Sequence, residues 1–197
     1  MNYTKIRQIR KLYFGCRDIS GALNITAESA KVAATRLVQQ GQLLRLKRNV
    51  YILKDRWDAL VREEKFMLAN LLQTPSYISL MTAMDYYEIT TQVQRDFIES
   101  IALYRTKEVN IEKNVFYYRK INKGLYFGFL KERGFFIATP EKAFLDALYF
   151  TSLKKYSFDI GSIDFGKLKM PIIRRMLKQY PQKTQKLCKT YGYFKQT

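Results

Sequence analysis

The chain has 197 residues, 47% of them hydrophobic and 15% aromatic, which is enough for one large domain or two small ones with true hydrophobic cores. It has no histidine, only two widely separated cysteines and no apolar run of about 18 residues, so we expect no His-dependent catalysis, no disulfide framework and no transmembrane helix. The N-terminus lacks the apolar segment of a secretory signal, so we expect a cytoplasmic protein. The net charge is +18, from 35 basic and 17 acidic residues.

Positive charge is concentrated at the two ends of the chain. Residues 1–56 hold 12 basic and 3 acidic side chains, and residues 151–197 hold 11 and 2, so each end carries a balance of +9. Residues 57–150 hold 12 of each sign. Such a distribution favours binding to nucleic acid or another polyanion, and general solubility is the plain alternative.

The first 40 residues predict three helices. Apolar residues at helical spacing predict an amphipathic first helix that ends near Gly15, and Asp18 is placed to cap a short second helix. Thr26 is placed to cap a third helix that runs to about Gln40, where Gly41 can end it.

The third helix has two different faces. Its apolar stripe consists of small residues and allows close packing: Ala30, Ala33, Ala34 and Leu37. Its opposite side is polar or cationic and carries Glu28, Lys31, Val32, Thr35, Arg36 and Gln39. A helix that enters the major groove of DNA needs this arrangement, because it must reach base edges and phosphates.

The stretch GQLLRLKRNVYILK, residues 41–54, predicts a hairpin with a cationic tip. A helix, a helix–turn–helix and a hairpin in this order predict a winged-helix domain over residues 1–56. We predict that the DNA-binding residues are Thr26, Glu28, Ser29, Lys31, Val32, Thr35 and Arg36 in the third helix, and Arg45, Lys47, Arg48 and Asn49 in the hairpin. A protein-binding module and a merely solvated tip are the alternatives.

Residues 57–197 predict a second domain of the α+β class. Strands are expected near 77–80, 97–104, 115–121, 125–130 and 135–138. Helices are expected from about 57 to 73, at about 80–88 with Ser79 as cap, from 140 to 150 with Thr139 as cap, and at about 166–179 and 182–193. The aromatic pairs Tyr86-Tyr87 and Tyr117-Tyr118 are expected in the core, with stacking on single-stranded RNA as the alternative.

No catalytic, cofactor or metal site is expected, so we predict a protein that is not an enzyme. The segment Ile160–Asp164 is similar to the Gly-Ser start of a nucleotidyltransferase site, but no carboxylate follows Asp164 to hold metal ions. Glu141 and Asp146 lie about 140° apart on a helix, so they do not converge as an acid–base pair. Glu141 is assigned to the positive end of the helix dipole.

Three stretches resemble, in the same order, the AbiEi family of antitoxins from type IV bacterial toxin–antitoxin systems. They are LVQQGQLLRLKRNVYIL at 37–53, YISLMTAMDYY at 77–87 and ATPEKAFLDALYF at 138–150. The resemblance implies an operon in which this gene precedes that of an AbiEii-like nucleotidyltransferase toxin that acts on RNA. It further implies that the winged helix represses the operon at inverted repeats, and that residues 57–197 counteract the toxin without a stable complex.

Family DNA binding maps onto Thr26–Gln40 and Arg45–Asn49 of this chain. The family commonly has glycine where Asn49 stands, and asparagine tolerates the same left-handed backbone angles. We therefore expect an autoregulatory repressor and antitoxin that is a monomer in solution, with cooperative binding on DNA left open. The alternatives are a winged-helix regulator with a ligand-sensing C-terminal domain, and an RNA-binding or RNA-modifying protein that uses residues 151–197.

Overall fold

The computed structural model describes residues 3–191 and has a mixed α+β fold with two sheets. The chain divides into two compact units, Met1–Lys65 and Phe66–Thr197, so the division lies later than the expected boundary after residue 56. The reason is that the helix following the hairpin, α4 (Lys54–Asp58), contacts both hairpin strands, and its Trp57 is buried. Over the described part of the chain, no helix is long and apolar enough to cross a membrane.

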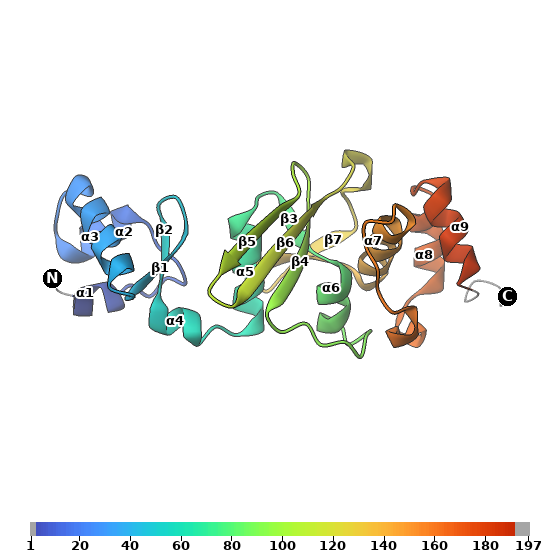
Figure 1. Ribbon diagram of the computed structural model, residues 1–197, viewed down its shortest axis with the longest axis horizontal. Coiled ribbons are helices and arrows are strands. Elements are labelled where there is room, and N and C mark those ends of the chain that lie inside the picture. The colour runs from blue at the N-terminus through green and yellow to red at the C-terminus, as the bar shows by residue number, and fades with distance from the viewer. Residues whose placement is uncertain (1–2, 192–197) are drawn as a thin grey trace. The chain divides into compact units, whose positions relative to one another are not determined.

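The N-terminal unit consists of helices followed by a two-stranded hairpin (Figure 1). Its elements before α4 are α1 (Tyr3–Arg7), α2 (Cys16–Leu23), α3 (Ala27–Gln39), β1 (Leu43–Lys47) and β2 (Val50–Leu53). The first helix is much shorter than predicted. The chain extends after it, because Phe14 pairs with Tyr51 of β2 through two backbone hydrogen bonds of 2.9 and 2.8 Å.

Helix α3 agrees with the sequence prediction at both ends. Thr26 caps it, since its Oγ1 accepts a hydrogen bond from the backbone N–H of Ser29 at 3.2 Å. Gly41 follows its end with a φ of +69°, and its N–H donates to the carbonyl of Val38 at 3.0 Å. The apolar stripe of α3 is buried in the core of the unit, together with residues of α1, α2 and the hairpin.

The C-terminal unit contains a six-stranded mixed sheet in the order β5-β6-β4-β3-β8-β7. The strands are β3 (Ser76–Ile78), β4 (Phe97–Ala102), β5 (Lys107–Ile111), β6 (Asn114–Lys120), β7 (Phe129–Glu132) and β8 (Phe135–Ala138). Strand β5 was not predicted, and the strand expected at 125–130 begins only at Phe129. The pairs β3–β8 and β4–β6 are parallel, and the other pairs are antiparallel.

The two faces of this sheet are covered by different helices. In the strand register, Ile78 and Tyr118 share one face and Tyr77 points to the other. Tyr118 donates a hydrogen bond to the carbonyl of Ala69 in α5 (Arg62–Leu72) at 2.7 Å. Tyr77 donates to Asp146 of α7 (Pro140–Ser152) at 3.0 Å. Helix α5 therefore lies on one face and α7 on the other.

The remaining helices pack around α7 (Figure 1). They are α6 (Leu80–Tyr86), α8 (Met170–Leu177) and α9 (Gln182–Thr190), and each contacts α7. Thr139 caps α7 as predicted, because its Oγ1 accepts from the N–H of Lys142 at 3.4 Å. The helix predicted to reach residue 193 ends at Thr190, and residues 192–193 lie outside the described range.

The single helix predicted from about 57 to 73 is in fact two helices, α4 and α5. The backbone leaves the helical path after Asp58, and Glu64 accepts a hydrogen bond from the N–H of Val61 at 3.3 Å. That bond occupies a backbone donor at the start of α5, so the break is stabilised locally.

A fully buried ion pair lies at the centre of the C-terminal unit. Lys142 and Asp146 are one turn apart on α7, both are completely buried, and they are hydrogen-bonded to each other. Lys142 Nζ also donates to the carbonyl of Leu125 at 2.9 Å and to the hydroxyl of Tyr180 at 2.8 Å. Burial lowers the pKa of Lys142, and the charge of Asp146 opposes this shift.

Asp146 also accepts hydrogen bonds from β3 and from the residue that follows it. Its Oδ2 accepts from Tyr77 at 3.0 Å and from the hydroxyl of Ser79 at 2.9 Å. Ser79 was predicted to cap α6, and it does precede that helix, but its side chain makes no capping bond and binds Asp146 instead. The buried charges are thus satisfied by hydrogen bonds, as a stable buried pair requires.

We predict that Asp146→Asn lowers the free energy of unfolding by about 3 kcal/mol, because it leaves the buried ammonium of Lys142 without a counter-charge. In a double-mutant cycle with Lys142→Met, the coupling energy should exceed about 1 kcal/mol. Urea denaturation of the four proteins measures both quantities.

The matched control is the exposed pair between Lys54 and Asp58, which has the same spacing on a helix and a distance of 2.6 Å. Its coupling energy should be at most about 0.5 kcal/mol. Similar coupling energies for the two pairs would contradict the prediction that the buried pair stabilises the fold more than the exposed pair does.

Candidate nucleic-acid interface

Helix α3 presents to solvent every residue that was predicted to contact the major groove. These exposed residues are Thr26, Glu28, Ser29, Lys31, Val32, Thr35 and Arg36. Neither Lys31 nor Arg36 forms an ion pair with any residue that the structure describes. Val32 is 51% exposed although it is apolar. The outward face therefore offers two cations and one apolar side chain.

The hydroxyl groups on α3 have partners within the helix. Thr26 accepts from the backbone of Ser29 and donates to its hydroxyl at 3.0 Å. Thr35 donates to the carbonyl of Lys31 at 3.0 Å. These bonds fix the helix and its first turn, so the long side chains of Lys31 and Arg36 remain as the groups with the greatest reach.

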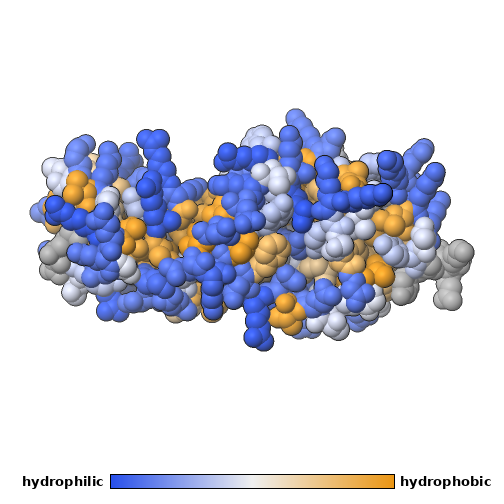
Figure 2. All heavy atoms as spheres, viewed as in Figure 1, coloured by the Kyte–Doolittle hydropathy of each residue, from blue (hydrophilic) through white to orange (hydrophobic). Residues whose placement is uncertain are grey.

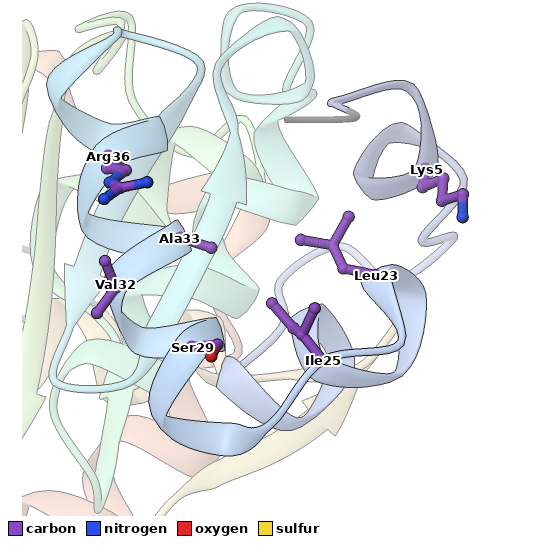
Figure 3. Close-up of a pocket in the computed structure, with 7 residues that line it drawn as sticks. All are labelled: Lys5, Leu23, Ile25, Ser29, Val32, Ala33 and Arg36. Carbon is purple, nitrogen blue, oxygen red and sulfur yellow. The ribbon is translucent and has the colours of Figure 1, made fainter.

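A shallow groove of about 470 Å³ lies beside this face of α3 (Figure 3). Leu23, at the end of α2, and Ile25, in the connection to α3, project toward α3, while Lys5 and Arg36 lie on opposite sides. Ser29 and Ala33 complete the lining. Sequence reasoning missed Lys5, Leu23 and Ile25, because tertiary packing of separate elements creates this groove. Apolar walls beside a cation suit a base methyl or sugar next to a phosphate.

The hairpin ends in a short cationic tip. Strands β1 and β2 are antiparallel, with an irregularity between Arg45 and Lys47, and Lys47 pairs with Val50 across the loop of Arg48 and Asn49. Arg45, Lys47 and Arg48 are exposed. Figure 2 shows strongly hydrophilic side chains that project at the end of this hairpin. The tip therefore adds positive charge to the same unit that carries α3.

Asn49 holds the tip of the hairpin against α2. Its φ of +59° is left-handed, as expected for a residue at a glycine position. Its Oδ1 accepts a hydrogen bond from the N–H of Cys16, at the start of α2, at 2.9 Å. A Cβ atom at Gly15 would lie 3.0 Å from the carbonyl oxygen of Asn49, so a larger residue there would require the two backbone segments to move slightly apart. Asn49 was predicted to contact DNA, and its side-chain oxygen is engaged within the protein.

The start of α2 also differs from the prediction. The helix begins at Cys16, so Asp18 is its third residue and not the residue before it. The carboxylate of Asp18 accepts from the N–H of Gly15 at 2.9 Å and pairs with Lys11 at 2.5 Å. The hydrogen bond from Lys11 and that from Gly15 lower the pKa of Asp18. Asp18 and Asn49 together satisfy backbone donors at this helix end.

The residues considered for catalysis have structural partners. Ser162 is hydrogen-bonded to Thr90 at 3.1 Å, and Asp164 accepts from a backbone N–H two residues further on. Glu141 was assigned to the helix dipole, and it also accepts from the N–H of Lys169, just before α8, at 3.2 Å. Between residues 3 and 191, no group of three or more His, Cys, Asp or Glu side chains could hold a metal ion.

Comparisons with protein-family models, with curated proteins and with solved structures give no match. The arrangement of side chains on α3 and the hairpin is the feature of the structure that bears on function. That arrangement combines an exposed polar and cationic face of α3 with a cationic hairpin tip. Both are features of proteins that bind nucleic acid.

We predict that Asn49→Gly lowers the free energy of unfolding by about 1 kcal/mol, because the N–H of Cys16 loses its acceptor while the backbone angles are preserved. Asn49→Ala should cost about 1 kcal/mol more, since alanine disfavours a positive φ. Chemical denaturation measures both values.

Asn49→Asp is the control, because it keeps both the acceptor and the tolerance of a left-handed backbone. Its stability should match that of the original protein. An Asn49→Gly protein that is more stable than the original would show that this hydrogen bond does not hold the hairpin.

Proposed function

We propose that the N-terminal unit is a winged-helix domain that binds double-stranded DNA. The observation that carries this proposal is the exposed polar and cationic face of α3, which lies in the same unit as a cationic hairpin. The order of the helices, the pairing of Phe14 with Tyr51 and the following hairpin support the winged-helix interpretation. In this arrangement α3 is the helix for the major groove, and the hairpin is the wing.

The side chains divide between two tasks. Lys31 and Arg36 reach base edges and flanking phosphates, and exposed Val32 suits contact with a thymine methyl group. Arg45, Lys47 and Arg48 contact the phosphate backbone or the minor groove. Asn49 positions the wing through its bond to α2.

We further propose that the whole chain is a cytoplasmic bacterial antitoxin of the AbiEi type. It would repress its own operon by binding inverted repeats, one monomer at each half-site, and it would counteract a nucleotidyltransferase toxin. The resemblance of residues 37–53, 77–87 and 138–150 to that family supports this role. The division into two units supports a separation of tasks, with DNA binding in the first unit and antitoxin action in the second.

A second candidate function is a winged-helix regulator whose C-terminal unit senses a ligand. One observation favours it, namely a groove of about 510 Å³ in that unit. The neighbouring gene distinguishes the two functions. A nucleotidyltransferase gene directly downstream supports the antitoxin, whereas a metabolic operon supports the sensor.

We predict that Lys47→Ala/Arg48→Ala weakens binding to a duplex with the promoter's inverted repeats by roughly tenfold, because two phosphate contacts are lost. The slope of log affinity against log salt should become flatter by roughly 0.9 for each contact. Mobility-shift assays at several salt concentrations measure both effects. The control, Lys178→Ala/Lys183→Ala, removes the same charge from exposed positions of the C-terminal unit and should bind normally.

The same full-length variant tests whether the two tasks are separate. Expressed from a promoter that the protein does not regulate, Lys47→Ala/Arg48→Ala should rescue growth from the induced toxin as well as the original protein does. Undiminished operator binding would contradict the wing assignment. If a folded variant lost both operator binding and the ability to rescue growth, the division of tasks between the units would be contradicted.

A further inference from the structure

A second groove, of about 510 Å³, lies on the C-terminal unit and is independent of the proposed DNA interface. Its floor comes from neighbouring strands of the sheet, with Phe97 and Glu99 on β4 and Arg119 on β6. Its wall is the segment Lys154–Ser157, which follows α7. In the strand register, Phe97, Glu99 and Arg119 occupy the same face, so they line one surface.

Arg119 is positioned at this surface by two aromatic rings and one hydrogen bond. Its guanidinium lies 4.7 Å from the ring centre of Tyr117 and 4.9 Å from that of Tyr156. One guanidinium nitrogen donates to the carbonyl of Lys155 at 3.0 Å. The Nε atom is buried and has no hydrogen-bond acceptor among residues 3–191. The rings therefore orient a cation whose donors are mostly unused by the protein.

Glu99 is the acidic residue of the groove, and burial makes its carboxyl group harder to ionise. Only 2% of it is exposed, and the hydroxyl of Tyr156 donates to its carboxyl group at 2.8 Å. Burial raises its pKa to about 7, although Tyr156 and Arg119 oppose the shift. Near neutral pH, the positive charges of Arg119, Lys154 and Lys155 therefore outweigh it.

Lys154 occupies a position where the backbone favours glycine. Its φ is +57°, and its N–H donates to the carbonyl of Thr151 at 2.9 Å, directly after the end of α7. The N–H of Lys155 donates to the carbonyl of Phe150 at 2.9 Å, which completes a common helix-ending motif. Glycine would adopt this conformation with less strain. The positive charge of Lys154 suits the negative end of the α7 dipole, and the same side chain lines the groove.

An exposed aromatic ring lies near these cations. Phe97 is 37% exposed, and its ring is stacked on Tyr117, with 6.2 Å between centres. Exposed aromatic faces beside fixed cations are the combination with which proteins bind nucleotides, because bases stack on rings and phosphates pair with Arg and Lys.

We propose that this groove binds a nucleotide, with the base against Phe97 and the phosphate against Arg119, Lys154 and Lys155. The nucleotide is either free or part of single-stranded RNA, since both present the same base and phosphate. Bound RNA would give the C-terminal unit access to a nucleic-acid substrate, and a free nucleotide would be a sensed ligand. The proposal does not depend on DNA binding by the N-terminal unit.

Lys154→Gly is the decisive variant, because it removes a cation from the groove while relieving backbone strain. All proteins are full-length and carry Lys47→Ala/Arg48→Ala, which suppresses binding at the hairpin. The probes are a labelled ten-nucleotide single-stranded RNA, followed by fluorescence anisotropy, and GMP, followed by calorimetry. We expect Lys154→Gly to lower the affinity at least fivefold while the melting temperature stays equal or rises.

Two further variants make the test specific. Lys178→Ala removes the same charge from an exposed position outside the groove, and its affinity should stay within twofold. Phe97→Leu should weaken binding of RNA or GMP at least threefold but leave binding of inorganic phosphate unchanged, because phosphate has no base to stack.

Binding of RNA alone, of GMP alone or of both, with these responses to Lys154→Gly and Phe97→Leu, supports the proposal and identifies the source of the nucleotide. Affinities that are unchanged in both variants overturn it. It is also overturned if an acidic peptide of equal charge binds as tightly as the RNA with the same response to the variants, because the groove would then recognise negative charge alone.

Discussion

The buried ion pair between Lys142 and Asp146 is the interaction on which the C-terminal unit depends. Its hydrogen bonds join α7 to β3, to the start of α6, to the connection before β7 and to the segment between α8 and α9. Because this pair fixes α7 over one face of the sheet, the segment Lys154–Ser157 that follows α7 can form the wall of the groove. The ionisable residues within ATPEKAFLDALYF therefore act in folding. The exposed cations of the groove follow that stretch in the sequence.

In the N-terminal unit, a few hydrogen bonds likewise fix the position of the hairpin. Backbone pairing between Phe14 and Tyr51 and the side-chain bond from Asn49 to α2 hold the hairpin against the helices. Small apolar residues of α3 fill the core, so its polar side faces outward. On that side Lys31 and Arg36 form no ion pair with any described residue, and the exposed hairpin tip adds positive charge, which suits an anionic partner such as DNA.

Local signals in the sequence predicted the structure correctly where a single segment determines its own conformation. Thr26 and Thr139 cap their helices as predicted, and the alanine stripe of α3 is buried. Features that depend on distant partners could not be predicted. The first helix ends early because its chain pairs with β2, Ser79 bonds to Asp146 in place of a helix end, and the groove unites strands with a loop that lies far away in sequence.

The central claim is that the first unit binds DNA through α3 and the hairpin tip. Nuclear magnetic resonance of the ¹⁵N-labelled full-length protein, titrated with the promoter duplex, tests it most directly, because each backbone amide reports separately. The account predicts the largest shifts for amides of Lys31–Arg36 and Arg45–Arg48, and weaker effects with an unrelated duplex. Shifts confined to residues after Phe66, or equal responses to both duplexes, would contradict it.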